Sequence, residues 1–91
     1  MNEASNELNA LLRVIPEGWS RTEIDGSSWA VTRTTRAGGK VVSIGAEQLG
    51  TAEQFGANVW ITDEETLLRP CEVPEEKVMR FMRAAAATFS A

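Results

Sequence analysis

The sequence SWAVTRTTR-AGGK-VVSIGAEQL, which runs from Ser28 to Leu49, decides the fold of this chain. Trp, Val, Thr and Ile are residues that strands favour, and a glycine pair between two such runs is typical of a β-hairpin. Because side chains alternate along a strand, Trp29 and Arg33 share one face of the first run and Ala30 and Thr32 share the other. Gly45 lies inside the second run, where a glycine indicates a bulge or a close backbone approach.

The segments on either side of this hairpin add further strands. Trp19–Asp25 alternates imperfectly and carries charges, which favours an edge strand, and Asp25-Gly26 is the dipeptide of a tight type I′ turn. The run at residues 57–62 predicts a fourth strand, and Leu67–Arg69 a short fifth strand that Pro70 ends. We expect residues 48–56 between them to form a loop with one helical turn.

A helix is expected at each end of the strand region. Residues 2–15 carry an apolar stripe at helical spacing, with Asn2 or Ser5 as the N-cap, and Pro16 ends this helix. Pro74 suits the first position of a second helix, because its missing N–H costs nothing there. One face of that helix collects five apolar residues, namely Val78, Phe81, Met82, Ala85 and Phe89.

Each helix has a single apolar stripe to bury, so both should pack on one face of the sheet. The sequence therefore predicts an α+β fold, an antiparallel meander of four strands, or five with 67–69, in the order α-β-β-β-β-(β)-α. The 91 residues show no internal repeat and no linker, which indicates one small globular domain over 1–91.

Composition excludes several classes of protein. The chain has one cysteine and no histidine, so an internal disulfide and histidine catalysis are excluded and the usual zinc ligands are missing. We expect no metal and no cofactor. No apolar run reaches the roughly 20 residues that cross a bilayer, and no signal peptide is recognisable. The sequence therefore predicts a cytoplasmic protein without a membrane association.

Charge is distributed unevenly along the chain. The net charge is −4, yet residues 13–40 carry +2 and residues 46–76 carry −7. Such asymmetry can orient a partner or favour self-association. The helix–strands–helix order resembles that of double-stranded RNA binders in element order only. Glu75-Glu76 stands where those proteins need a basic cluster, so the sequence argues against nucleic acid.

Cys71 is the one strong nucleophile by type, but its setting argues against reactivity. It precedes the second helix, whose N–H groups could favour a thiolate, while Glu72, Glu75 and Glu76 would disfavour one. No histidine can act as its base. Cys71 is therefore a weak catalytic candidate. A thiol-dependent enzyme or redox protein that uses Cys71 remains an alternative function.

The residues expected to bind a ligand or partner lie on the hairpin and the fourth strand. We select Trp29, Arg33, Arg36, Lys40 and Trp60, because tryptophan anchors interfaces and the open sheet face should carry basic residues. Packing of Trp29 against Trp60 across the sheet is the structural alternative. The main hypothesis is a non-enzymatic module that binds a protein partner or a second copy. Small-ligand binding on the open sheet face is another alternative.

Overall fold

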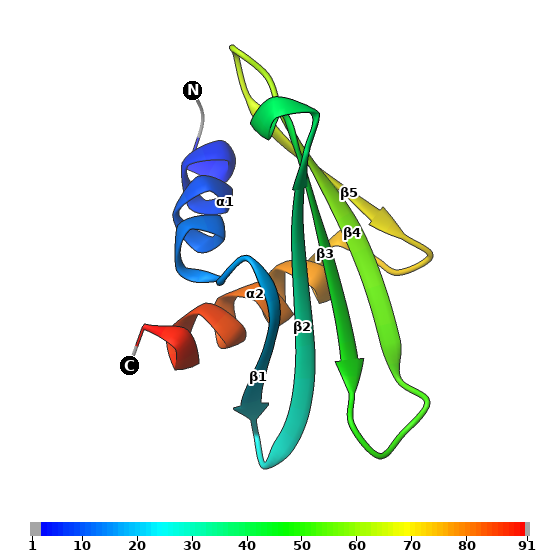
Figure 1. Cartoon of the computed structure of the whole chain (residues 1–91). Coiled ribbons are helices and arrows are strands. Elements are labelled where there is room, and N and C mark those ends of the chain that lie inside the picture. Colours follow the sequence, from blue (N-terminus) through cyan, green and yellow to red (C-terminus); the bar gives the residue numbers. More distant parts are fainter. Residues whose placement is uncertain (1–2, 91) are drawn as a thin grey trace.

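The computed structural model describes residues 3–90 and confirms the predicted α+β meander, with the fifth strand present (Figure 1). The five strands form one antiparallel sheet in the order β1-β2-β3-β4-β5, and both helices lie on the same side of it. The elements in chain order are α1 (Glu3–Val14), β1 (Gly18–Ile24), β2 (Ser27–Arg36), a 3-10 turn (Ala37–Gly39), β3 (Val41–Gln48), β4 (Gln54–Ile61), β5 (Thr66–Cys71) and α2 (Glu75–Phe89).

The two tight turns of the N-terminal half have the expected chemistry. Asp25 and Gly26 both have positive φ, 52° and 81°, which is the signature of a type I′ hairpin. Between β2 and β3, Gly38 and Gly39 also have positive φ, a conformation that glycine adopts without strain. The glycine pair is therefore a turn between strands.

The segment between β3 and β4 differs from the prediction. No helical turn is present there, because β3 extends to Gln48 and β4 begins at Gln54. The short loop is closed by backbone and hydroxyl hydrogen bonds instead. The N–H of Gln48 donates to the carbonyl of Glu53 at 2.9 Å, and the N–H of Glu53 donates to Thr51 Oγ1 at 3.1 Å. These local bonds replace those of a helical turn.

Strand β5 and helix α1 also differ from the prediction in detail. Pro70 does not end β5, which continues to Cys71. A proline is tolerated because β5 is an edge strand and the missing N–H lies on its outer side. Ser5 is not the N-cap of α1 but lies inside the helix, where its Oγ accepts the N–H of Thr66 at 3.0 Å. Asn2, the other predicted cap, lies outside the described residues.

The core lies between the sheet and the two helices. The strands contribute side chains that alternate along each strand, and the helices contribute the predicted stripes; the buried set includes Leu8, Leu12, Ile15, Val31, Val42, Ile44, Val59, Leu68, Val78, Phe81, Met82 and Ala85. Burying one such aliphatic side chain stabilises the fold by roughly 1.5–3 kcal/mol. We call this side of the sheet the covered face and the other side the open face.

An aromatic cluster extends the core beside α2. The ring of Trp29 lies 5.9 Å from that of Phe55 and 4.9 Å from that of Phe81, and the Phe55 and Phe81 rings are 5.2 Å apart. Trp60 is on β4, is 48% exposed and lies on the open face. The alternative that Trp29 packs against Trp60 is therefore wrong, because the two rings lie on opposite faces of the sheet.

Candidate functional site

The open face is traversed by one row of five residues that the strand register places side by side. Trp19 of β1 pairs with Thr32, Thr32 with Gly45, Gly45 with Gly56, and Gly56 with Cys71 of β5. Four inter-strand spacings of about 4.8 Å make this row roughly 19 Å long. The large side chain of Trp19 stands at one end of the row, and the third and fourth residues, Gly45 and Gly56, have no side chain.

A groove follows this row. Its main part has a volume of about 590 Å³ and is bordered by Trp19 on one side and by residues 71–73 on the other, with Glu47 and Gln54 along its length. A second part of about 290 Å³ continues along β2, β3 and β4 towards Arg36. Thr32, Gly45, Gly56 and Cys71 line both parts, so the two form one continuous surface, which we call the groove. Its main part falls within the usual size of ligand pockets.

Gly45 and Gly56 form the floor of the groove. Unlike the glycines in the turns, they are not required by the backbone conformation. Neither has positive φ, and a Cβ built on Gly45 would meet no atom within 4 Å. At Gly56 the nearest atom would be the carbonyl oxygen of Ile44 at 3.4 Å. Glycine in a strand interior costs roughly 0.5–1 kcal/mol relative to alanine. The chain therefore carries a destabilising residue at a position where packing would accept a larger one.

The walls of the main part combine an aromatic ring with carboxylates. Trp19 is 64% exposed, the largest exposure among the large hydrophobic residues of the described chain. Glu47 and Glu72 also line this part, and no arginine or lysine does. Among residues 3–90, the ion pairs join other carboxylates, from Glu7, Glu17, Glu53 and Glu76. The main part of the groove is thus acidic, and its carboxylates are available.

Three of the predicted binding residues gather at the opposite end of the open face. Arg36 pairs with Val41, which pairs with Trp60, so the three share one row. Lys40 precedes Val41 in the turn, and its carbonyl accepts the N–H of Ile61 at 2.7 Å. Only Arg36 of this group lines the groove, at the end of its second part. The structure therefore brings Arg36, Lys40 and Trp60 together, away from the acidic part.

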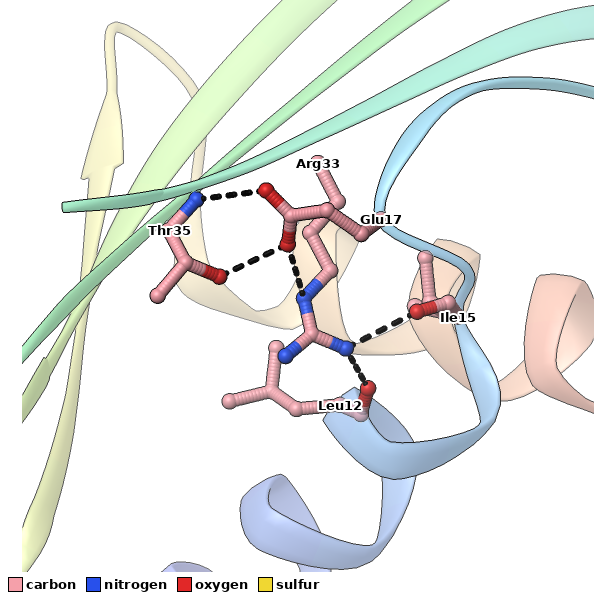
Figure 2. Close-up of polar contacts among 5 residues, drawn as sticks. All are labelled: Leu12, Ile15, Glu17, Arg33 and Thr35. Atoms are coloured by element: carbon pink, nitrogen blue, oxygen red, sulfur yellow. Dashed lines mark hydrogen bonds and ion pairs between the residues drawn. The ribbon is translucent and has the colours of Figure 1, made fainter. Parts of the chain in front are cut away.

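The other two predicted binding residues, Trp29 and Arg33, lie on the covered face. Trp29 belongs to the aromatic cluster described above. Arg33 joins β2 to the end of α1, where its Nη1 donates to the carbonyl of Ile15 at 2.9 Å and also to that of Leu12 (Figure 2). These carbonyls lie at the C-terminal end of the helix, where backbone acceptors lack intrahelical partners and a cation is favourable.

Glu17 completes this structural contact. Its Oε1 is 3.4 Å from the Nε of Arg33, close enough for an ion pair but without hydrogen-bond geometry (Figure 2). The hydroxyl and the backbone N–H of Thr35 donate to the same carboxylate at 2.7 and 2.9 Å. These hydrogen bonds, assisted by the charge of Arg33, lower the pKa of Glu17. The arrangement ties α1, the following loop and β2 together.

Cys71 lies at the end of the row and is exposed. Its neighbour Glu72 has a positive φ of 62°, an unusual conformation for a residue with a side chain, where the chain leaves β5 and turns towards α2. No group of three or more Cys, Asp or Glu residues within 3–90 is arranged to hold a metal ion. Within the same range, no helix combines the length and the apolar character needed to span a membrane.

Sequence reasoning missed the residues that shape the groove: Trp19, Glu47, Gly56 and Glu72. Two signals were available. Trp19 stands on the charged face of a predicted edge strand, and Gly45 is a glycine within a strand. Neither signal shows that Gly45 lies opposite Gly56, because that depends on the register between β3 and β4.

Comparison of the chain with protein-family models, with curated proteins and with solved structures finds no match. The function is therefore inferred from the geometry of the open face alone.

Proposed function

We propose that this chain is a binding module that receives a short basic peptide segment of a partner protein in the groove of the open face. The observation that carries the proposal is the pair of opposed glycines, Gly45 and Gly56, in a row that has the exposed Trp19 at one end. Natural strands avoid interior glycine unless a backbone or a ligand must come close. At Gly45 the strand register is regular and an added Cβ would meet no other atom of the chain within 4 Å, which supports a ligand as the reason for the glycine.

The charge of the main part selects a cationic ligand. Glu47 and Glu72 can pair with a lysine or arginine side chain, and the face of Trp19 attracts a cation by about 0.5–1 kcal/mol at an exposed site. Long aliphatic stems of lysine and arginine also bury well against apolar surface. The row of roughly 19 Å accommodates about six extended residues at about 3.3 Å each.

NMR titration tests the proposal without knowledge of the natural partner. A short acetylated, amidated peptide that alternates lysine or arginine with glycine is added to ¹⁵N-labelled protein, with an acidic peptide of the same length as the control. The expected result is saturable shifts of the Gly45 and Gly56 amides and of the Trp19 indole N–H with the basic peptide only. Glu47→Gln and Glu72→Gln should weaken binding, whereas Glu64→Gln in the exposed β4–β5 turn should not.

Three outcomes would contradict the proposal. Absence of chemical-shift changes at millimolar concentrations of the basic peptide would exclude a basic ligand. Shifts spread over Glu64, Glu65 and Glu75 would indicate attraction to the acidic surface in general. Free lysine or arginine binding as tightly as the peptide would indicate a small-molecule site in the groove, which is the alternative predicted from the sequence.

A thiol function of Cys71 is the second candidate, and one observation favours it. Cys71 is exposed and lines both parts of the groove, so a bound molecule would lie beside its sulfur. Alkylation by iodoacetamide, measured against pH, tests this function. The pKa of a free cysteine thiol is about 8.5. An alkylation rate that already reaches its plateau at a pH well below this value would support a reactive cysteine. A rate that follows a small model thiol would remove it.

A further inference from the structure

The two edges of the sheet differ, and the edge formed by β5 is partly blocked. Backbone groups of Thr66, Leu68 and Pro70 point outward from this strand. Ser5 Oγ accepts the N–H of Thr66 at 3.0 Å and donates to its carbonyl at 3.3 Å. The carbonyl of Leu68 accepts Arg69 Nη1 at 3.4 Å, and Pro70 has no N–H. Side-chain caps and proline are common ways to keep an edge strand from pairing.

The edge formed by β1 carries no such protection. In the type I′ hairpin Ile24 pairs with Ser27, so the even-numbered residues of β1 direct their backbone groups towards β2. The N–H and C=O groups of Trp19, Arg21 and Glu23 then point outward. No hydrogen bond within residues 3–90 joins these outward groups to another segment. Figure 1 shows β1 as the outer strand on this side of the sheet.

We propose that β1 pairs with β1 of a second copy of this chain, antiparallel, with Thr22 opposite its own equivalent on the two-fold axis. This register places Arg21 opposite Glu23 of the second copy and Glu23 opposite its Arg21. Both residues direct their backbone groups outward, so each pair exchanges two backbone hydrogen bonds and joins opposite charges on the open face.

The two neighbouring registers that keep the hydrogen-bond pattern are unfavourable. A shift by two residues places Arg21 opposite its own equivalent in one direction and Glu23 opposite its own equivalent in the other, so like charges meet on the axis in both. Neither Arg21 nor Glu23 forms an ion pair within the described part of its own chain, although Arg21 Nη2 donates to the exposed Ser28 Oγ at 3.1 Å; both charges can therefore pair with those of the second copy. Residue i meeting j while j meets i is the geometry of a closed two-fold dimer, and here it joins the two sheets into one.

Charge exchange tests this register. The molar mass of the protein is measured by light scattering and by sedimentation from low micromolar to millimolar concentration. The wild type should dimerise as the concentration rises. Arg21→Glu and Glu23→Arg should each weaken the dimer about tenfold, because each places two like-charge pairs in the contact. A mixture of the two variants should form a heterodimer, since the glutamate introduced in one chain then meets the arginine introduced in the other.

Matched variants control for net charge, and circular dichroism confirms folding of each variant. Arg80→Glu and Glu64→Arg make the same charge changes on α2 and in the β4–β5 turn, and should leave dimerisation unchanged. A strict monomer at millimolar concentration would overturn the proposal. So would a dimer that is insensitive to Arg21→Glu and Glu23→Arg, or single variants whose mixture stays monomeric. Because dimerisation is measured without peptide, none of these results depends on peptide binding.

Discussion

Replacing Gly45 by valine should stabilise the protein, which is unusual for a substitution in the middle of a sheet. Gly45 has no positive φ, and its added Cβ meets nothing within 4 Å, so the larger residue fits without strain. Removing a strand glycine stabilises by roughly 0.5–1 kcal/mol, and a β-branched residue suits the pleated surface. For a domain of this size, about 1 kcal/mol raises Tm by about 4–8 °C, so we expect a rise of roughly 2–8 °C.

Thermal and urea unfolding, followed by circular dichroism, measure this change. Gly45→Ala should raise the stability by less than Gly45→Val does. Gly56→Ala should leave the stability nearly unchanged, because its Cβ would lie 3.4 Å from the carbonyl oxygen of Ile44. A fall of Tm in Gly45→Val, with the m-value unchanged, would refute the reasoning. It would mean that the fold itself needs the glycine, and the groove would lose its main argument.

Four further predictions concern contacts that stabilise the fold. Arg33→Ala should destabilise by about 1.5–3 kcal/mol in urea unfolding, because α1 loses charged hydrogen bonds to its last carbonyls, and Arg33→Lys should recover only part. The depressed pKa of Glu17 stabilises the fold above the ordinary glutamate value of about 4.3, and this stability is lost as the pH falls through the folded pKa; Glu17→Gln should therefore flatten the acid limb of a stability–pH curve. Ala37 has a φ of 53°, so Ala37→Gly should raise stability by about 1 kcal/mol, and an unchanged midpoint in urea would contradict this. Trp29→Ala should cost about 3 kcal/mol and Trp60→Ala less than about 1 kcal/mol in the same assay, since only the first ring is part of the aromatic cluster.

The fold followed from local signals that agree with one another. The hairpin Ser28–Leu49, the turn at Asp25-Gly26 and the start of α2 after Pro74 all depend on residues close together in the chain. Such signals act through φ, through missing N–H groups and through side-chain periodicity. The predicted ends of helices and strands were less accurate where contacts between distant residues determine them. Ser5 is an example, because it forms a hydrogen bond with Thr66 of the edge strand β5.

The candidate site was less predictable than the fold, because the sequence does not show which face of the sheet the helices cover. Trp29 and Arg33 were correctly placed on one face, but both faces of β2 carry polar residues. The covered face accepts Arg33 because the C-terminal end of α1 supplies carbonyl acceptors, a contact between segments 18 residues apart. Predicting that Gly45 lies opposite Gly56 requires the register between β3 and β4. The sequence of the loop that joins these strands does not determine this register by a simple rule.

The most direct test of the proposed groove compares wild-type protein with Gly45→Val in calorimetric titration with the same lysine-containing peptide. The groove account predicts that the wild type binds and that Gly45→Val, although at least as stable, loses most of the affinity because its side chain fills the floor. Gly45→Ala should lie between them. Equal affinity of wild type and a folded Gly45→Val would contradict the account, because the ligand would then bind elsewhere on the molecule.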